Sequence, residues 1–423
     1  MKEGEIVRKT IRKNLILSIF FVMLFAPFAW GMGGNDLLSG DLKAQFLFLS
    51  KQVNPRSGVN PSQSLVYNNR GIVPDDGGNL YLSGSLQTQF YPWEIFLEPL
   101  ITVNQKTTAL LHEGYLGYRG SSLHVEIGKK SLWWGPGVYG SLLLSKNAEP
   151  LTLIRVHHPD LFLLPGFLRV IGPLQFDFFV SRLEEDRVIP QPYFQGTRIV
   201  LKPHSIVDVG LTRTIIMGGE GKPSITPLRY WDIWFGENKD AGLDSSNSVA
   251  GLDIQLTFPS VRFYGEWGGE DEAGFFPSKG AYIVGAYFPG LFQNYFRVEY
   301  ADITDPSWYV HSVYQSGYTY KKQILGHHVG RGGSDLYFEQ GIVSHENKRG
   351  KITFDYQERG VNIQPVVERH YQVGTTWEFE INKAIIPGRI KATLVYERIQ
   401  NEAYQTGLDK ENALVAFSFI VQR

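Results

Sequence analysis

From residue 79 to its end, the chain repeats short segments in which apolar and polar residues alternate. In 351–357 and 389–397, for example, an apolar residue stands at nearly every second position and a charged or hydroxyl-bearing residue lies between. A period of two places successive side chains on opposite faces of a strand. About 16 to 18 such segments follow one another, most of roughly 9–11 residues, the length of a tilted membrane-spanning strand. The pattern predicts an all-β protein whose residues 79–423 form a transmembrane antiparallel β-barrel.

The alternation also fits a soluble alternative, because the outer face of a secreted β-sandwich is polar too. Such a protein would be an exported all-β lectin with stacked domains. Two features favour the barrel. No change of composition between residues 79 and 423 marks a linker between domains. The last segment, 415–421, alternates as a strand, as expected where a closed barrel pairs its first strand with its last.

The first 31 residues have the composition of a secretory signal peptide. Basic residues precede a short apolar run, 15–25, and the small-residue site Ala29-Trp30-Gly31 follows. The run is shorter than the roughly 20 residues that a membrane-spanning helix needs. We therefore expect an exported protein in which residues 32–78 form a periplasmic leader or a reduced plug. The most favourable place for a helix is 36–52.

Composition excludes several kinds of chemistry. The chain has no cysteine, which excludes disulfides, thiol catalysis and cysteine-bound zinc, and its formal net charge of −1 gives no basic field for nucleic acid. Aromatic residues make up 14% of it, as in the girdles of outer-membrane barrels and in carbohydrate-binding proteins. The sequence contains no Gly-x-Ser-x-Gly, His-Glu-x-x-His or P-loop motif. We expect neither enzymatic activity nor a cofactor.

One stretch is too ordered to follow from composition alone. Trp133-Trp134-Gly135-Pro136-Gly137 leads into an apolar run that ends at Asn147-Ala148-Glu149-Pro150. Glycine supplies a positive φ and proline fixes φ near −65°, so the two tryptophans enter a sharp reversal of the chain. Such rings serve either as anchors at a membrane interface or as stacking faces for a ligand. We expect this motif mainly to form a turn between strands.

The 133–150 stretch resembles the capsule assembly protein Wzi family, whose members carry Trp-Trp-Gly-Pro-Gly followed by Ser-Leu-x-Leu-Ser-x-Asn-Ala-x-Pro. The stretches 247–253, 264–271 and 317–330 are similar to the family as well, as is Trp231-Asp232-Ile233-Trp234. The resemblance implies an outer-membrane barrel of about 18 strands, closed by an N-terminal helical bundle, that attaches capsular polysaccharide without catalysis. Because this chain has a short segment before its first clear strand, we expect the bundle to be missing or reduced.

Two long connections, 217–247 and 304–334, interrupt the strand pattern. Long connections of outer-membrane barrels usually lie on the extracellular side, and long loops are usually functional. Sugar recognition combines aromatic faces with fixed hydrogen-bonding groups. The candidate polysaccharide-binding residues in these connections are Trp231, Trp234, Arg229, Asp232, Trp308, Tyr318 and Tyr320. Packing of the loops across the barrel mouth would explain each of these residues equally well.

An acidic cluster and two histidine pairs are the candidates for metal binding. The acidic residues are Glu266, Glu270, Asp271 and Glu272. They either bind a divalent cation, since Ca²⁺ and Mg²⁺ prefer clustered carboxylates, or form a solvated loop. The pairs His157-His158 and His327-His328 are poor metal sites, because adjacent residues of a strand point to opposite faces. We expect structural roles for these histidines.

The expected function is that of an outer-membrane lectin-like protein. It would bind capsular or other surface polysaccharide and help to attach or assemble it at the cell surface. A porin-like channel for small polar or charged solutes is the first alternative, and a secreted soluble lectin is the second. We expect an integral protein of the outer membrane that the barrel assembly machinery inserts after signal-peptide export. It would contact lipopolysaccharide and lipid, act as a monomer and bind no nucleic acid.

Overall fold

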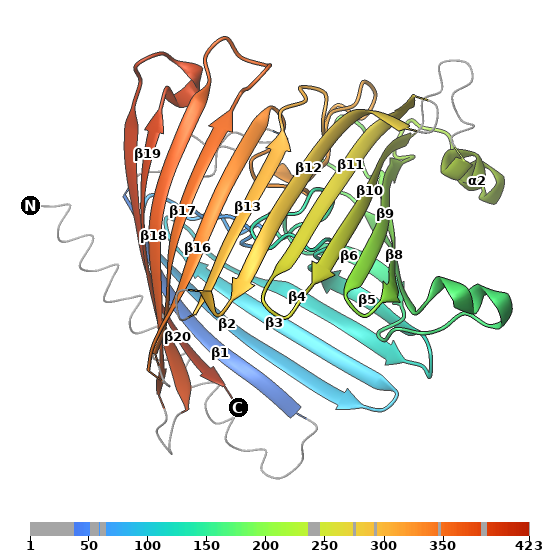
Figure 1. Ribbon diagram of the computed structural model, residues 1–423, viewed down its shortest axis with the longest axis horizontal. Coiled ribbons are helices and arrows are strands. Elements are labelled where there is room, and N and C mark those ends of the chain that lie inside the picture. Colours follow the sequence, from blue (N-terminus) through green and yellow to red (C-terminus); the bar gives the residue numbers. More distant parts are fainter. Residues whose placement is uncertain are drawn as a thin grey trace, which may run out of the picture.

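The computed structural model describes residues 38–50, 59, 65–235, 246–273, 276–291, 294–345, 348–381 and 387–422. Its main feature is one antiparallel sheet of 18 strands that closes into a barrel (Figure 1). The first strand pairs with the second on one side and with the last on the other, so the sheet has no open edge. The predicted transmembrane β-barrel is confirmed, at the upper end of the predicted number of strands.

The strands follow one another round the barrel in chain order. The first nine are β1 Leu38–Leu49, β2 Gly77–Phe90, β3 Trp93–Val103, β4 Thr107–Arg119, β5 His124–Lys130, β6 Leu151–His157, β7 Leu174–Arg182, β8 Tyr193–His204 and β9 Val207–Met217. The other nine are β10 Ser246–Thr257, β11 Arg262–Ala273, β12 Phe276–Pro289, β13 Tyr295–Ile303, β16 Gly333–His345, β17 Lys348–Arg359, β18 Glu368–Ile381, β19 Gly388–Gln400 and β20 Lys410–Gln422. Outside the barrel wall lie the hairpin β14 Thr319–Tyr320 and β15 Gln323–Ile324, the helix α2 Pro227–Phe235, and the 3-10 turns η1 Gly166–Ile171 and η3 Glu402–Tyr404.

The N-terminal boundary of the barrel differs from the prediction. Residues 38–49 form β1, so the helix expected in 36–52 is wrong and the barrel begins well before residue 79. Leucine, lysine, alanine and glutamine favour a helix locally. Here the backbone of β1 instead pairs with β2 and β20, which closes the barrel. The predicted signal peptide, 1–31, lies outside the described residues.

Burial along the strands is the reverse of that in a water-soluble sheet. On β17, the side chains of Ile352 and Phe354 face outward and are 47% and 38% exposed, whereas Asp355 is only 2% exposed. On β20, Phe417 and Phe419 are likewise exposed on the outer face. An apolar outer band around a polar interior suits lipid and would be unfavourable in water. The secreted soluble lectin is therefore excluded.

The two ends of the barrel carry different connections. β1 starts and β20 ends at the same end, where most connections are short, such as 205–206 between β8 and β9 and 258–261 between β10 and β11. The long connections 217–247 and 304–334 leave the opposite end, as the sequence predicts. Outer-membrane barrels have short periplasmic turns and longer extracellular loops. The long-loop end is therefore the extracellular end.

Two elements project sideways from the barrel wall, α2 at the long-loop end and the segment around η1 at the other (Figure 1). Both expose large apolar side chains: Leu228 and Phe235 on α2, and Phe167 and Val170 on η1. Such side chains continue the apolar outer band toward the two surfaces of the bilayer. Within the described part of the chain, no helix has the length and apolar character to cross a membrane.

Candidate functional site

Three segments between strands fold into the barrel interior. They are 65–76 before β2, 131–150 between β5 and β6, and 304–332 between β13 and β16, named here the N-terminal, tryptophan and tyrosine segments. Apolar side chains of the tryptophan and tyrosine segments form one core with side chains of the wall, and those of the N-terminal segment pack in a second cluster against β1, β2 and β20. The buried members of the core include Trp134, Leu142, Leu143, Leu144, Phe179, Phe194, Trp308, Tyr309 and Tyr318. The interior is thus packed where a porin of this strand number would hold a water-filled channel.

Two buried glutamates of the wall hold the tryptophan segment in place. Glu266 of β11 accepts hydrogen bonds from the backbone N–H groups of Gly137 (3.1 Å) and Leu142 (2.9 Å). Glu299 of β13 accepts from the N–H groups of residues 138–140 at 2.8–3.1 Å. A loop inside a barrel has no neighbouring strand to accept its N–H groups, and leaving them unpaired is costly. The two carboxylates supply the missing acceptors.

Glu270 follows Glu266 by four residues on β11 and holds the tyrosine segment in the same way. It accepts a hydrogen bond from the backbone N–H of Tyr309 at 2.9 Å. Glu266 and Glu270 are thus buried acceptors for loop backbone, and the solvated or cation-binding cluster that the sequence suggests does not form around them. The side chains of Asp271 and Glu272 lie outside the described part of the chain.

The Trp-Trp-Gly-Pro-Gly motif lies in the 131–150 connection between β5 and β6, where the chain reverses and the backbones of Trp134 and Leu144 pair antiparallel, and it packs inside the barrel and not at a hairpin of the wall. Trp134 lies in the buried core, where its indole N–H donates to Asp177 at 3.1 Å and its ring packs 5.2 Å from that of Phe179. Gly196 on β8 leaves room for it, since a Cβ atom there would lie 2.7 Å from the indole ring. Trp133 is only half-buried, and its indole N–H donates to the carbonyl of Gly137 within the segment.

Asn147, near the end of the motif, joins the three inward segments. Its side-chain oxygen accepts from the N–H of Asn68 (2.8 Å) in the N-terminal segment, and its amide group donates to the carbonyl of Gly326 (2.9 Å) in the tyrosine segment. The N-terminal segment is also fixed to the wall, because Arg70 pairs with Glu98 of β3 and Glu113 of β4. Residues 65–76 thus help to fill the interior from the long-loop end, where they connect β1 with β2, while most of the core comes from loops further along the chain.

The aromatic residues predicted in the tyrosine segment are buried. Trp308 has no exposed surface, and Tyr318 and Tyr320 are almost fully covered. Tyr318 donates its hydroxyl to the carbonyl of Leu143 at 2.7 Å, and Tyr309 donates to that of Leu142 at 2.5 Å. In this arrangement these rings tie two loops together and offer no face to a sugar.

The aromatic residues predicted in the other long connection lie on α2. Trp231 is 53% exposed and its ring stacks on that of Phe235. Trp234 packs toward the barrel, where its indole N–H donates to Tyr230 (2.7 Å) and Arg213 lies over its ring. The side chains of Arg229 and Asp232 are partly exposed beside them. The structure therefore brings together four of the predicted binding residues on one short helix, and their role in sugar binding stays a prediction.

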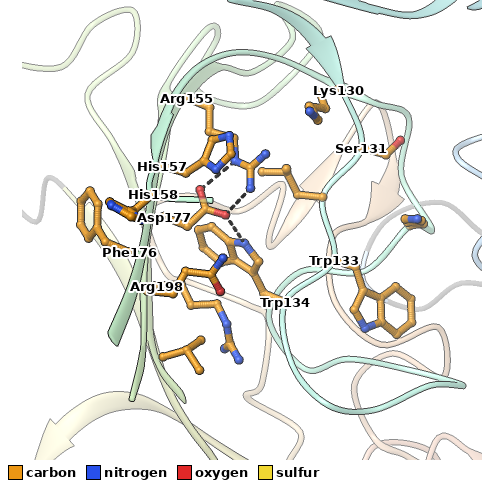
Figure 2. Close-up of a pocket in the computed structure, with 14 residues that line it drawn as sticks. Lys130, Ser131, Trp133, Trp134, Arg155, His157, His158, Phe176, Asp177 and Arg198 are labelled. Carbon is orange, nitrogen blue, oxygen red and sulfur yellow. Dashed lines mark hydrogen bonds and ion pairs between the residues drawn. The ribbon is translucent and has the colours of Figure 1, made fainter. Parts of the chain in front are cut away.

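A cavity of about 350 Å³ lies between the tryptophan segment and the wall (Figure 2). Six residues of its lining supply an indole face and basic groups: Lys130, Trp133, Lys146, Arg155, His157 and Arg198. Acidic partners balance some of these charges, since Arg155 pairs with Asp177 (2.6 Å) and Arg198 with Asp253 (2.6 Å). An aromatic face among cations can hold an acidic sugar residue.

Sequence reasoning missed this cavity, because its lining comes from four strands and a loop. Part of the wall lies near the short-turn end, since His157 is the last residue of β6 and Asp177 lies close to the start of β7, whereas Lys130 is the last residue of β5, on the side of the long-loop end. Arg155 and His157 do stand two apart on one strand, which is the pattern of a shared face. That pattern alone could not identify which residues lie opposite them.

The model of the capsule assembly protein Wzi family matches residues 51–414 of the chain. The chain belongs to this family. Its fold is similar to that of the Escherichia coli outer-membrane protein Wzi, a carbohydrate-binding β-barrel involved in group 1 capsule assembly. The two share a TM-score of 0.68 at 19% identity, over 89% of this chain and 83% of the other. Membership of the Wzi family and the barrel fold assign the protein to the outer membrane, in agreement with the prediction.

Two other similarities are weaker. Over 169 residues the chain is 30% identical to an uncharacterised 55.8 kDa protein of the cps region of Klebsiella pneumoniae, a match that covers 38% of this chain and 33% of that relative. The chain therefore spans about a third of this relative's length. The outer-membrane protein OprD of Pseudomonas aeruginosa shares the barrel alone, with a TM-score of 0.51 at 8% identity over 91% of this chain and 94% of the other. Neither changes the assignment to the Wzi family.

Proposed function

We propose that this protein is an outer-membrane lectin-like barrel that binds capsular or other surface polysaccharide and helps to attach or assemble it at the cell surface. The observation that carries the proposal is the packed interior. A barrel filled by its own loops cannot serve mainly as a conduit, so its long-loop end is left as the working surface. Family membership supports polysaccharide as the class of ligand.

The proposed binding place is the face of α2 at the long-loop end. Trp231 offers an exposed ring, and Arg229 and Asp232 of the same helix supply partly exposed polar groups. An aromatic face with adjacent polar groups is the arrangement that sugar recognition uses. The cavity beside Trp133 has the same kind of groups, but part of its wall lies toward the short-turn end. It is therefore a less direct place for a polysaccharide on the cell surface.

The proposed cellular setting follows from a barrel in the outer membrane. Export by the signal peptide, insertion by the barrel assembly machinery and contact with lipopolysaccharide at the long-loop end are parts of the proposal. The protein would act as a monomer.

Deletion of the gene tests the function directly. We expect polysaccharide to be made at the normal level but to be shed into the medium, because its anchor on the cell is missing. The measurement is the ratio of cell-bound to released polysaccharide, with a strain complemented by the wild-type gene as control. An unchanged ratio would contradict the attachment role.

A substitution on α2 tests the proposed binding place. Trp231→Ala removes the exposed ring and is expected to weaken polysaccharide binding roughly tenfold, about 1–2 kcal/mol, as loss of a stacking face does. Binding of the purified full-length protein in detergent to the polysaccharide is measured by calorimetry. Trp133→Ala is the matched control, since it removes a half-buried ring from the cavity. If the control loses binding and Trp231→Ala retains it, the cavity is the binding place.

The wild-type protein is also expected to conduct poorly. In planar lipid bilayers, its insertion should give no large, long-lived steps of current, because the inward segments contact strands on several sides of the lumen. Stable open channels of porin size would instead favour the alternative of a solute channel.

A further inference from the structure

A cluster of buried ionisable side chains lies where the tyrosine segment meets the wall. It consists of His328 on that segment, Asp335 on β16 and Asp355 on β17, each only 2% exposed. The Nε2 atom of His328 lies 2.6 Å from an oxygen of Asp335, and the carboxyl group of Asp355 is within hydrogen-bond reach of that of Asp335. His328 and Asp335 therefore meet inside the protein, and Asp355 lies on the other side of the Asp335 contact, next to its carboxyl group.

The groups in this cluster do not satisfy one another by hydrogen bonding. Neither ring nitrogen of His328 and neither oxygen of Asp335 has a hydrogen-bond partner among the described residues. Asp355 uses one oxygen to accept from Tyr139 (2.6 Å) and Gln357 (2.8 Å), and its other oxygen also lacks a partner. Buried polar atoms are nearly always paired, and a set of unpaired ones that face one another is expected around an ion.

Charge leads to the same inference. Two carboxylates in contact inside a protein need a proton or a cation between them. Arg359, the cationic side chain that acts on Asp335, also faces the buried acids Glu368 and Glu397. It therefore cannot balance Asp335 and Asp355 by itself.

We propose that His328, Asp335 and Asp355 form a binding site for a divalent transition-metal ion of the zinc class. One imidazole with two carboxylates is a ligand set that suits Zn²⁺, whereas Ca²⁺ and Mg²⁺ prefer oxygen ligands throughout. Water or His327 would complete the coordination.

His327 has a lesser part in the site. Its ligand atom lies within 4.8 Å of those of His328 and Asp335. The sequence predicts that the two rings point to opposite faces of a strand. The pair lies in a loop instead, and the rings stack with centroids 4.3 Å apart and an angle of 25° between their planes. Two nearly parallel rings cannot both aim a nitrogen at one ion, and Nδ1 of His327 already accepts from the N–H of Val329. His327 would have to turn before it could bind.

Such an ion would fasten all three inward segments to the wall. Tyr139 of the tryptophan segment donates to the ligand Asp355, and Tyr67 of the N-terminal segment stacks on the ring of His328 with centroids 4.1 Å apart. A second cavity, of about 230 Å³, is lined by Tyr67, Tyr139, Tyr337 and Asp355, so one side of the cluster borders on open space. The metal would thus be structural, and its removal would loosen the packed interior.

Metal analysis of the full-length protein tests this inference independently of polysaccharide binding. The protein carries a purification tag without histidine, is stripped with a chelator, and is dialysed against Zn²⁺ or Co²⁺. We expect about one ion per chain, a visible absorption band with Co²⁺, and no comparable binding of Ca²⁺ or Mg²⁺. The ion should also raise the temperature at which the barrel loses its compact mobility on a gel.

Two variants locate the site. Asp335→Asn and His328→Ala are expected to weaken the binding of Zn²⁺ by about 100-fold or more, whereas the control His204→Ala, on an exposed histidine at the end of β8, leaves it unchanged. Compact gel mobility shows which variants fold. The test on the stripped wild-type protein does not depend on the folding of any variant. Failure of the folded wild type to take up either metal would overturn the proposal, and a proton shared by the two carboxylates would then explain the cluster. Unchanged metal binding in a folded Asp335→Asn variant would also overturn it.

Discussion

Replacement of both Glu266 and Glu299 by alanine is expected to convert a closed barrel into a conducting one. The two carboxylates accept two and three backbone N–H groups of the tryptophan segment, respectively. Each N–H group left buried without an acceptor costs about 1–3 kcal/mol. The segment would avoid this cost by leaving the interior or by admitting water. Because a barrel of 18 strands is wide enough for an aqueous channel, conductance should rise roughly tenfold or more.

The measurement is current per inserted protein in planar bilayers. Glu378→Ala is the matched control. Glu378 is a more exposed acid of β18, and its Oε1 atom lies 3.9 Å from the Nζ atom of Lys391. The control should insert and remain closed. Compact gel mobility shows whether the double variant folds. A folded double variant that conducts no more than the wild type would contradict the role of the two glutamates in keeping the tryptophan segment inside the barrel.

The strands of the barrel could be predicted because each carries its own signal. In 351–357 and 415–421 the apolar residues recur with a period of two, and both stretches lie in strands whose apolar side chains face outward. β1 shows the limit of this reasoning. Its composition favours a helix, and what makes it a strand is pairing with β20, the far end of the chain.

The interior could not be predicted, because its contacts join residues far apart in the sequence. The N–H groups of 138–140 meet Glu299, and the side chain of Asn147 meets Asn68 and Gly326. A motif such as Trp-Trp-Gly-Pro-Gly indicates a specific local structure, but its residues alone do not identify Glu299 of β13 as the acceptor of the N–H groups that follow it. Likewise, the sequence does not show whether the carboxylate of an acidic residue in a strand accepts hydrogen bonds from a loop or from water.

Aromatic residues were ambiguous for a related reason. The sequence of a long loop does not show whether a tyrosine or tryptophan ring in it packs in a core or faces a ligand. The tyrosine segment turned out to lie inside the barrel, where Trp308 and Tyr318 are buried, while Trp231 on α2 is exposed. Only the burial of each ring separates these two outcomes, and burial depends on where the loop folds.

The second large effect is expected at Trp134. Its truncation to alanine empties a buried site beside Phe179 and Gly196 and removes the indole N–H that donates to Asp177. Trp→Ala changes in cores cost about 3–5 kcal/mol. The temperature at which the barrel loses its compact gel mobility should therefore fall clearly in Trp134→Ala. Trp93→Ala is the control for loss of an indole, because Trp93 is exposed on the outer face.

Trp133→Ala is expected to change this temperature little, because Trp133 is half-buried and its N–H bonds only within its own segment. The variant that lacks both rings should then behave as Trp134→Ala does, with impaired barrel assembly and little loss of polysaccharide affinity in the molecules that fold. Equal destabilisation by the two single changes would contradict this division between the adjacent tryptophans. A double variant that folds normally but no longer binds would show that the motif carries the ligand site after all.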